Sequence, residues 1–231
     1  MSSADESKRN EFNNAIKQAS KTMNETKNPD CLSSTEMKYQ VQINDSCEKT
    51  MKWLIFRRLG FSTKGNCPVT IKKAYQKGDI GLLPRGGVAF PIFEKDQECV
   101  MEHGRVFCSL PLPLESGLPI HFNGHFALDH EARRSLYTDD QEGYHVVWNK
   151  HLLKDIIVPS YTTGLIEIKD LLGLETDSQV NELQLRKKLS IFHGYFPDFE
   201  KAKNDNFKSN KYAAFTAGLT AMKFQFSSPQ N

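Results

Sequence analysis

The spacing of apolar residues changes along the chain, and the change predicts strands first and helices later. Residues 37–43 read MKYQVQI, with every second side chain apolar, which is the period of a strand with one buried face. The stretch TMKWLIFRR (50–58) follows a polar turn and predicts the partner strand. From Val146 onward the apolar residues recur at helical spacing. This order predicts an α+β fold with a mostly antiparallel sheet, followed by a helical C-terminal region.

An amphipathic helix is expected before the strands, over residues 3–27. Ser3 and Glu6 fit a capping box at its start. Its apolar stripe is thin and consists of Phe12, Ile16, Ala19 and Met23. Such a helix is expected on a surface or against a partner segment. The chain is thereby divided into three parts: an N-terminal surface helix (1–30), an α+β domain (31–145) and a helical C-terminal region (146–231).

Two further strands are expected, at 86–93 and 104–110, while the stretch 67–79 gives no clear signal. Pro91 places the first of these strands at an edge or interrupts it. The connection PLPLESGLP after the second is expected to be extended and rich in turns. The strongest local signal is Asn123-Gly124, which lies between apolar stretches and predicts a type I′ hairpin at the centre of the sheet.

Four helices are expected in the last third of the chain. The first starts near Val146 and stops before Pro159, because proline disfavours helix in the residue before it. The third ends with Gly194 as its cap, and Pro197 follows. The second, third and fourth helices are expected over residues 163–172, 178–192 and 212–222, respectively.

Composition narrows the functional classes. The chain has 231 residues, 39% of them hydrophobic and 25% charged, with a net charge of +2, which is typical of a globular protein. That charge gives no general electrostatic case for nucleic acid or a membrane as partner, and no apolar run is long enough for a membrane helix. Five widely spaced cysteines without a C-x-x-C motif favour reduced thiols in a cytoplasmic protein. They are Cys31, Cys47, Cys67, Cys99 and Cys108.

His121 and His125 have the H-x-x-x-H spacing of a helical metal site. In a hairpin that turns at Asn123-Gly124, however, the two imidazoles point to opposite sides of the sheet. In one straight strand they would instead lie about 13 Å apart, at about 3.3 Å per residue. Neither geometry lets them share an ion, so no metal site is expected.

Arginines are the candidates for phosphate recognition, because a guanidinium is always charged and can clamp a phosphate with two hydrogen bonds. Arg133 and Arg134 form a pair, and the competing interpretation is a solvated helix face or ion pairs with neighbouring carboxylates. Arg85 is a weaker candidate. It precedes Gly86 and Gly87, which are interpreted as a tight turn that uses the positive φ available to glycine.

Catalytic chemistry has weak support in the sequence. His130 could work with the flanking carboxylates Asp129 and Glu131 as an acid–base group, but Asp129 fits better as the cap of a helix. Cys108 could act as a nucleophile, although nothing near it in sequence supports that role. The chain contains no phosphate loop, nucleophile elbow, H-E-x-x-H or dinucleotide fingerprint.

Several segments together resemble the sacsin family. They are LPRGGVAFPI, then GRVFCSLPLPLESGLPIHFNGHFALDHEARRSLY, then HVVWNKHLLKDIIVPSY, with HGYFPDF following. The similar region runs from about Met51 to Phe199. In that family a large repeat joins an ATPase module, like that of the ninety-kilodalton heat-shock chaperone, to a downstream portion. This chain resembles the downstream portion, and its α+β part is similar to the second domain that follows such ATPase modules.

The resemblance implies chaperone-type interaction with protein clients or co-chaperones, by a chain without its own nucleotide site or cofactor. No Asn-x-x-Asp-Ala, Asp-x-Gly-x-Gly or His-Pro-Asp motif occurs in the sequence. An alternative is an auxiliary domain that needs ATP only when an ATPase module is supplied, in the same product or by another chain. Arg133, Arg134 or Arg85 would then approach the γ-phosphate. A third alternative is a small hydrolase that uses His130 or Cys108.

Overall fold

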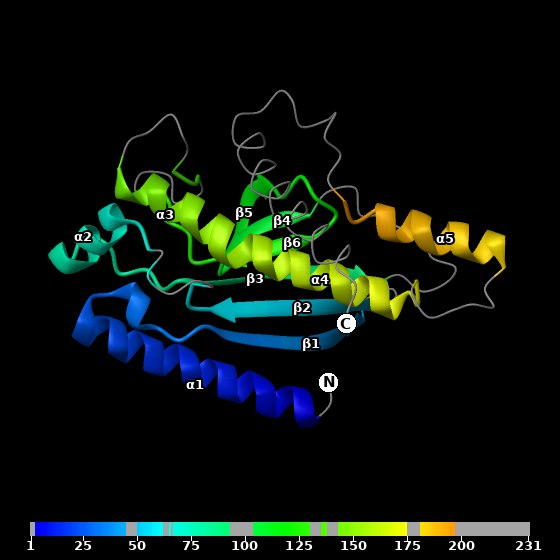
Figure 1. Cartoon of the computed structure of the whole chain (residues 1–231), viewed down its shortest axis with the longest axis horizontal. Helices are drawn as coiled ribbons and strands as arrows, with labels where there is room; N and C mark the ends of the chain where they lie inside the picture. The colour runs from blue at the N-terminus through cyan, green and yellow to red at the C-terminus, as the bar shows by residue number, and fades with distance from the viewer. Residues whose placement is uncertain are drawn as a thin grey trace, which may run out of the picture.

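The strands of the protein form one mixed sheet, in the order β1-β2-β3-β6-β4-β5 (Figure 1). The computed structural model describes residues 3–44, 50–61, 65, 67–92, 104–129, 135–137, 143–174 and 181–196. All strand pairs are antiparallel except β4 with β6, which is parallel. The strands are β1 (Thr35–Asn44), β2 (Thr50–Leu59), β3 (Arg85–Ile92), β4 (Arg105–Cys108), β5 (Leu110–Glu115) and β6 (His121–Gly124). The predicted α+β class is confirmed.

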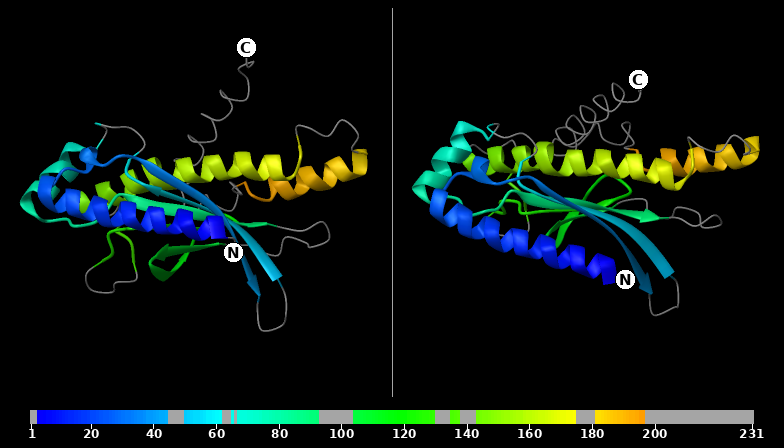
Figure 2. Two further views of the ribbon diagram at one scale, coloured as in Figure 1. Left: turned by 90° about the horizontal axis from the view of Figure 1, so that it is seen from below. Right: turned by 60° about the horizontal axis from the view of Figure 1, so that its bottom comes forward.

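Helices cover the sheet on both sides, with α1 on one side and α3 and α4 on the other (Figure 2). The predicted N-terminal helix is confirmed, and Phe12, Ala19 and Met23 of its stripe are buried. The stretch without a sequence signal forms α2. The helices are α1 (Ser3–Thr26), α2 (Val69–Lys77), α3 (Tyr144–Leu152), α4 (Val158–Leu171) and α5 (Glu182–His193). None of the helices described here is long and apolar enough to span a bilayer.

The predicted hairpin at Asn123-Gly124 is wrong, because both residues lie inside β6. Gly124 pairs with Gly86 and Asn123 with Gly87, in antiparallel register. The N–H of His125 continues this pattern by donating to the carbonyl oxygen of Arg85 at 3.0 Å. Backbone hydrogen bonds to a neighbouring strand have therefore overridden the local turn preference. A Cβ on Gly124 would press against Phe126 and Leu152, so this glycine serves packing.

Gly86 and Gly87 are likewise strand residues, and the tight turn predicted for them is wrong. Neither is among the residues with positive φ. A Cβ on Gly87 would overlap the carbonyl oxygen of Phe56 on β2, and one on Gly86 would meet Ile157 on the helical side. The glycines therefore permit close approach of backbone and side chains, which is the other common use of glycine in a strand.

The connection predicted after residue 110 is partly a strand, because residues 110–115 form β5. The chain turns from β4 into β5 at Ser109, whose φ is 64°. The edge or interruption predicted from Pro91 is wrong for the strand as a whole, because β3 runs through Pro91 and lies between β2 and β6. At Pro91 itself only β2 is a neighbour, since β6 pairs with β3 only as far as Ala89. On its open side, the Pro91 carbonyl accepts a hydrogen bond from the Tyr195 hydroxyl at 2.5 Å.

The predicted helix end before Pro159 is wrong, because α3 and α4 are joined by a π-helical segment, Leu153–Ile157. Proline lacks an N–H and its ring would clash with the carbonyl four residues earlier in a regular α-helix. The wider π turn avoids this, and the N–H of Val158 donates to the carbonyl of Leu153, five residues back. The third predicted helix is confirmed as α5, with Gly194 as its C-cap. The fourth lies outside the described residues.

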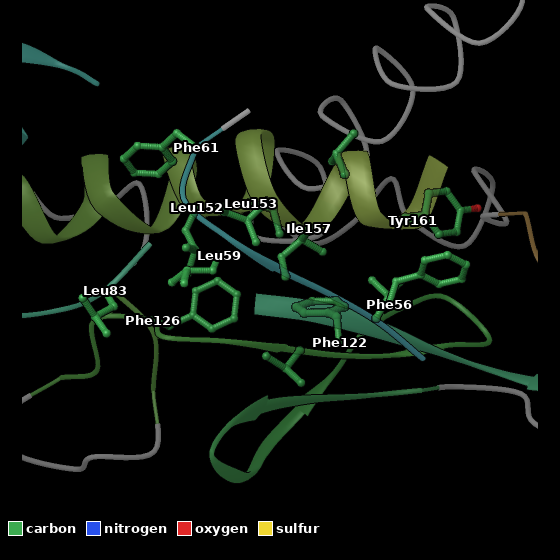
Figure 3. Close-up of a cluster of buried hydrophobic side chains, with 14 of the residues drawn as sticks. Phe56, Leu59, Phe61, Leu83, Phe122, Phe126, Leu152, Leu153, Ile157 and Tyr161 are labelled. Atoms are coloured by element: carbon green, nitrogen blue, oxygen red, sulfur yellow. The ribbon is translucent and has the colours of Figure 1, made fainter. Parts of the chain in front are cut away.

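The helices α3 and α4 and the π-helical segment between them form one continuous rod, which we call the α3–α4 rod. Much of the hydrophobic core lies between the sheet and this rod (Figure 3). Phe56 and Phe122 point from the sheet toward Ile157 and Tyr161 on the rod. Phe90 stacks on Tyr161 with ring centroids 5.8 Å apart. The same cluster includes residues from all three parts into which the sequence divides the chain, and the boundaries of that division remain a prediction.

The close approach at Gly87 gives a stability prediction. Replacing Gly87 with alanine forces a Cβ against the backbone of Phe56, so we expect a loss of about 1–3 kcal/mol of unfolding free energy. Denaturant unfolding followed by circular dichroism measures this. Gly81 is the matched control, since a Cβ added there would meet nothing within 4 Å; Gly81→Ala is expected to change stability by less than about 0.5 kcal/mol. Equal effects of the two substitutions would contradict the packing argument.

Candidate functional site

A cavity of about 420 Å³ lies on the side of the sheet that carries α1. Its position follows from the register of the central strands. Arg57 of β2 is paired with Gly87, which in turn is paired with Asn123 of β6. Because Gly87 has no side chain, the space between Arg57 and Asn123 stays open. Two residues along β3, the small Ala89 lies between Ile55 and His121 and widens the hollow.

The cavity is basic. Arg57 and Arg85 both line it, and none of its described lining residues is a carboxylate. The guanidinium of Arg57 lies 4.7 Å from the centre of the Phe12 ring of α1, a cation–π contact. Burial is the main cause that lowers the pKa of Arg57, and a hydrogen bond with Tyr39 partly offsets it. Since arginine stays protonated in proteins, two positive charges line one hollow.

Two histidines add hydrogen-bond donors to the same cavity. Nδ1 of His121 accepts the backbone N–H of Arg105, and Nδ1 of His125 accepts that of Leu83, both at 2.9 Å. Each neutral ring therefore carries its proton on Nε2. Burial lowers the pKa of both rings, to about 4 for His125, where the charge of Arg85 adds to the effect. At neutral pH both are uncharged donors.

A second cavity, of about 440 Å³, shares Arg85 and His125 with the first. One wall of this cavity is formed by polar and apolar side chains of α1 and by Lys27, which follows the helix. The α1 residues are Ile16, Ser20, Met23 and Asn24. The other side is the α2–β3 connection, which contributes Ile80 and Leu83. The two cavities adjoin at Arg85 and His125 and both have α1 residues in their lining, so we treat them together as the α1 groove.

The structure brings most of the predicted site residues together. Arg85, Gly86, Gly87, Asn123 and Gly124 all line the first cavity, although the sequence pattern assigned them to two separate turns. Arg133 and Arg134 lie outside the described residues, as does His130.

Three functional candidates were missed or misinterpreted in the sequence. Arg57 follows Trp53 and Ile55 at strand spacing, so a charge on an otherwise apolar face was a readable signal. From the sequence, His121 and His125 are expected to pack in the sheet rather than bind a metal, and the structure adds that their rings accept backbone N–H groups. Within the part of the chain that the structure describes, no group of three or more His, Cys, Asp or Glu residues could hold a metal ion.

The thiols of Cys67 and Cys108 lack the lowered pKa of a catalytic nucleophile. Cys31, Cys67 and Cys108 are free. Burial raises the pKa of Cys67 to about 12 and also raises that of Cys108. The Cys108 thiol donates to the carbonyl oxygen of Phe126 at 3.5 Å. A nucleophilic cysteine needs a lowered pKa, so the environment of Cys108 opposes the hydrolase interpretation.

A buried polar cluster accompanies the π-helical segment. Arg58 pairs with Glu36, and Nε2 of His151 lies 3.7 Å from Oδ2 of Asp155. Burial lowers the pKa of both Arg58 and His151. Arg58 is adjacent to Arg57 on β2, so its side chain points to the other face of the sheet. The cluster is therefore separate from the α1 groove.

Comparison with known proteins assigns the chain to a family. Sacsin from Homo sapiens is 38% identical to it over 169 residues. The chain is sacsin-like. The aligned region covers 70% of this sacsin-like chain and 4% of the length of that relative. No family model matches the chain, and no solved structure matches it either. The resemblance to the sacsin family is thus confirmed, while the position downstream of an ATPase module stays a prediction.

The low pKa of His125 predicts a pH dependence of stability. Its pKa is about 4 in the fold and about 6.5 in an unfolded chain. As pH falls from 6.5 toward 4, the unfolded chain takes up the proton first, so unfolding becomes more favourable. His125→Asn keeps an acceptor for the Leu83 N–H but cannot titrate. We therefore expect the unfolding free energy of this variant to fall by about 2 kcal/mol less between pH 7 and pH 4 than that of the unaltered chain. Denaturant unfolding at pH 7 and pH 4 measures it; identical pH profiles would contradict the assignment.

Proposed function

We propose that this sacsin-like chain is a chaperone-type protein-interaction module that binds apolar segments of partner proteins without a nucleotide of its own. The observation that carries the proposal is α5. None of its residues is buried, and Leu183, Leu185 and Leu189 are 63%, 39% and 47% exposed. Leu185 and Leu189 lie on one face of the helix and Leu183 on another, and exposed apolar side chains on one face are typical of protein-binding sites.

The helix is held firmly enough to present these side chains. The Asn181 side chain caps its start by accepting the N–H groups of Leu183 and Gln184. Its end is anchored through Tyr195, whose carbonyl accepts the Tyr161 hydroxyl at 2.8 Å. Leu185 and Leu189 are four residues apart and so share one face. A partner segment could therefore dock on a preformed helix, which lowers the entropic cost of binding.

From the sequence, two contact surfaces are expected for such a module: the strand edge near residues 86–93 and the helical region after Val146. The helical region after Val146 includes α5 and supports the proposal. The strand stretch 86–93 is largely interior, because β2 and β6 flank its first half. The chaperone role itself rests on the resemblance to sacsin, of which the aligned region is a small part.

The proposal predicts that the double variant Leu185→Ser/Leu189→Ser loses binding to a permanently unfolded, reduced and alkylated test protein. Removing two exposed leucines deletes apolar contact area without affecting the core, so we expect affinity to fall about tenfold or more. Fluorescence anisotropy without nucleotide measures it.

Leu110→Ser is the matched control for that experiment, since Leu110 is 75% exposed but lies on β5. Its binding is expected to equal that of the unaltered chain. No binding by the unaltered chain, or equal losses in the control and the double variant, would remove the proposal.

One observation favours the auxiliary-domain alternative: Arg85 lies in an open, basic cavity. A guanidinium there could reach the γ-phosphate of ATP held by a separate ATPase module and stabilise the transition state. In that case Arg85→Ala is expected to lower the turnover of a sacsin-like ATPase module mixed with this chain, or joined to it, by about 10²-fold or more. The variants Arg133→Ala and Arg134→Ala test the other two arginines in parallel. Unchanged ATP turnover in all three would exclude this role.

A further inference from the structure

One wall of the α1 groove is a single stripe of helix α1. Phe12 lines the first cavity, and residues further along the helix line the second. The stripe consists of Phe12, Ile16, Ser20, Met23, Asn24 and Lys27, which recur at helical spacing. Because the stripe runs over most of α1 and the two cavities share Arg85 and His125, the groove is elongated. An elongated groove fits an extended chain better than a compact small molecule.

The charge of the groove has one sign. Lys27, Arg57 and Arg85 contribute to its walls, and no aspartate or glutamate is found among its described lining residues. The cations are distributed along the groove: Arg57 in the first cavity, Lys27 in the second, and Arg85 where the two meet. A cleft lined by charges of one sign concentrates its field and favours an oppositely charged ligand. The net charge of the whole chain is only +2. The excess of positive charge in the groove is therefore local and does not reflect a generally basic protein.

The rest of the lining alternates apolar surface with neutral hydrogen-bonding groups. Ile55 and Phe107 lie in the first cavity, and Ile80 and Leu83 in the second. The amide of Asn123 and the Nε2–H groups of the two histidines add polar partners. The rings at the first cavity are already in contact, with Phe12 under Arg57 and His121 stacked on Trp53 at 4.9 Å. Stacking of nucleic-acid bases, which needs open rings, is therefore disfavoured relative to a peptide.

We infer that the α1 groove binds an extended acidic segment of a partner protein, with carboxylates on Lys27, Arg57 and Arg85 and apolar side chains between them. Helix α1, which lines this groove, lies on the opposite side of the sheet from α3 and α4 (Figure 2). None of the residues of α5 lines the groove. The inference goes beyond the proposed function, because it names a second class of partner with different chemistry. Neither binding event requires the other.

The test uses the full chain and a short fluorescein-labelled peptide in which glutamate alternates with leucine. A second peptide with glutamine in place of glutamate has the same shape without the charge. Anisotropy is expected to show saturable binding of the acidic peptide, weakened by added NaCl, and at least about tenfold weaker binding of the neutral one. Arg57→Gln and Arg85→Gln are expected to weaken the acidic peptide about tenfold, and the more exposed Lys27→Gln about threefold.

Lys73→Gln is the matched control, since Lys73 is an exposed lysine of α2 that does not line the groove; its binding is expected to be unchanged. If either arginine variant fails to fold, two further measurements test the inference. Lys27→Gln is compared with the unaltered chain, and NMR of the unaltered chain follows the ring resonances of His121 and His125, which bound peptide is expected to shift. Absence of acidic-peptide binding, equal binding of the neutral peptide, or insensitivity to all three substitutions would overturn the inference. Tighter binding of a single-stranded oligonucleotide than of the peptide would overturn it too. The unfolded-protein assay on α5 is read separately, so the two proposals fail independently.

Discussion

The close contact between the backbones of β2 and β3 at Gly87 is the constraint on which most of the structure depends. A side chain at this position would overlap the Phe56 carbonyl, so only glycine lets the two strands keep their register. That register aligns Phe56 with Val88 on the helical side and Arg57 with Gly87 on the side of α1. The same missing side chain therefore permits a tightly packed core on one face and leaves a hollow on the other.

The two faces of the sheet have different chemistry for this reason. On the helical face, phenylalanines from three strands pack against a rod that the π-helical segment keeps continuous through Pro159. On the face of α1, the same strands carry Arg57, His121 and Asn123, which the helix covers only along one side. The packed helical face holds the sheet rigid, and α1 covers the other face only in part. A groove can stay open in such a fold because side chains anchored in β-strands keep their positions without a ligand.

The two proposed interaction surfaces, α5 and the α1 groove, differ in chemistry, and part of the groove lining belongs to the hydrophobic core. The leucines of α5 can bury apolar segments of an unfolded chain, whereas the α1 groove has charge for an acidic one.

Local sequence patterns determined the elements whose signal is short-range: the stripe of α1, the alternation in β1, the strand β2 that follows it, and the C-cap of α5. They did not determine what Gly86, Gly87, Asn123 and Gly124 do. Asn-Gly favours a turn by a small local preference, while several backbone hydrogen bonds between β3 and β6 favour a strand, and only the fold brings those strands together. Pro159 is similar, since the core contacts of the rod outweigh the break that proline favours. The α1 groove was beyond local reasoning because its cations come from positions 27, 57 and 85, which become neighbours only when the sheet register and the position of α1 are set.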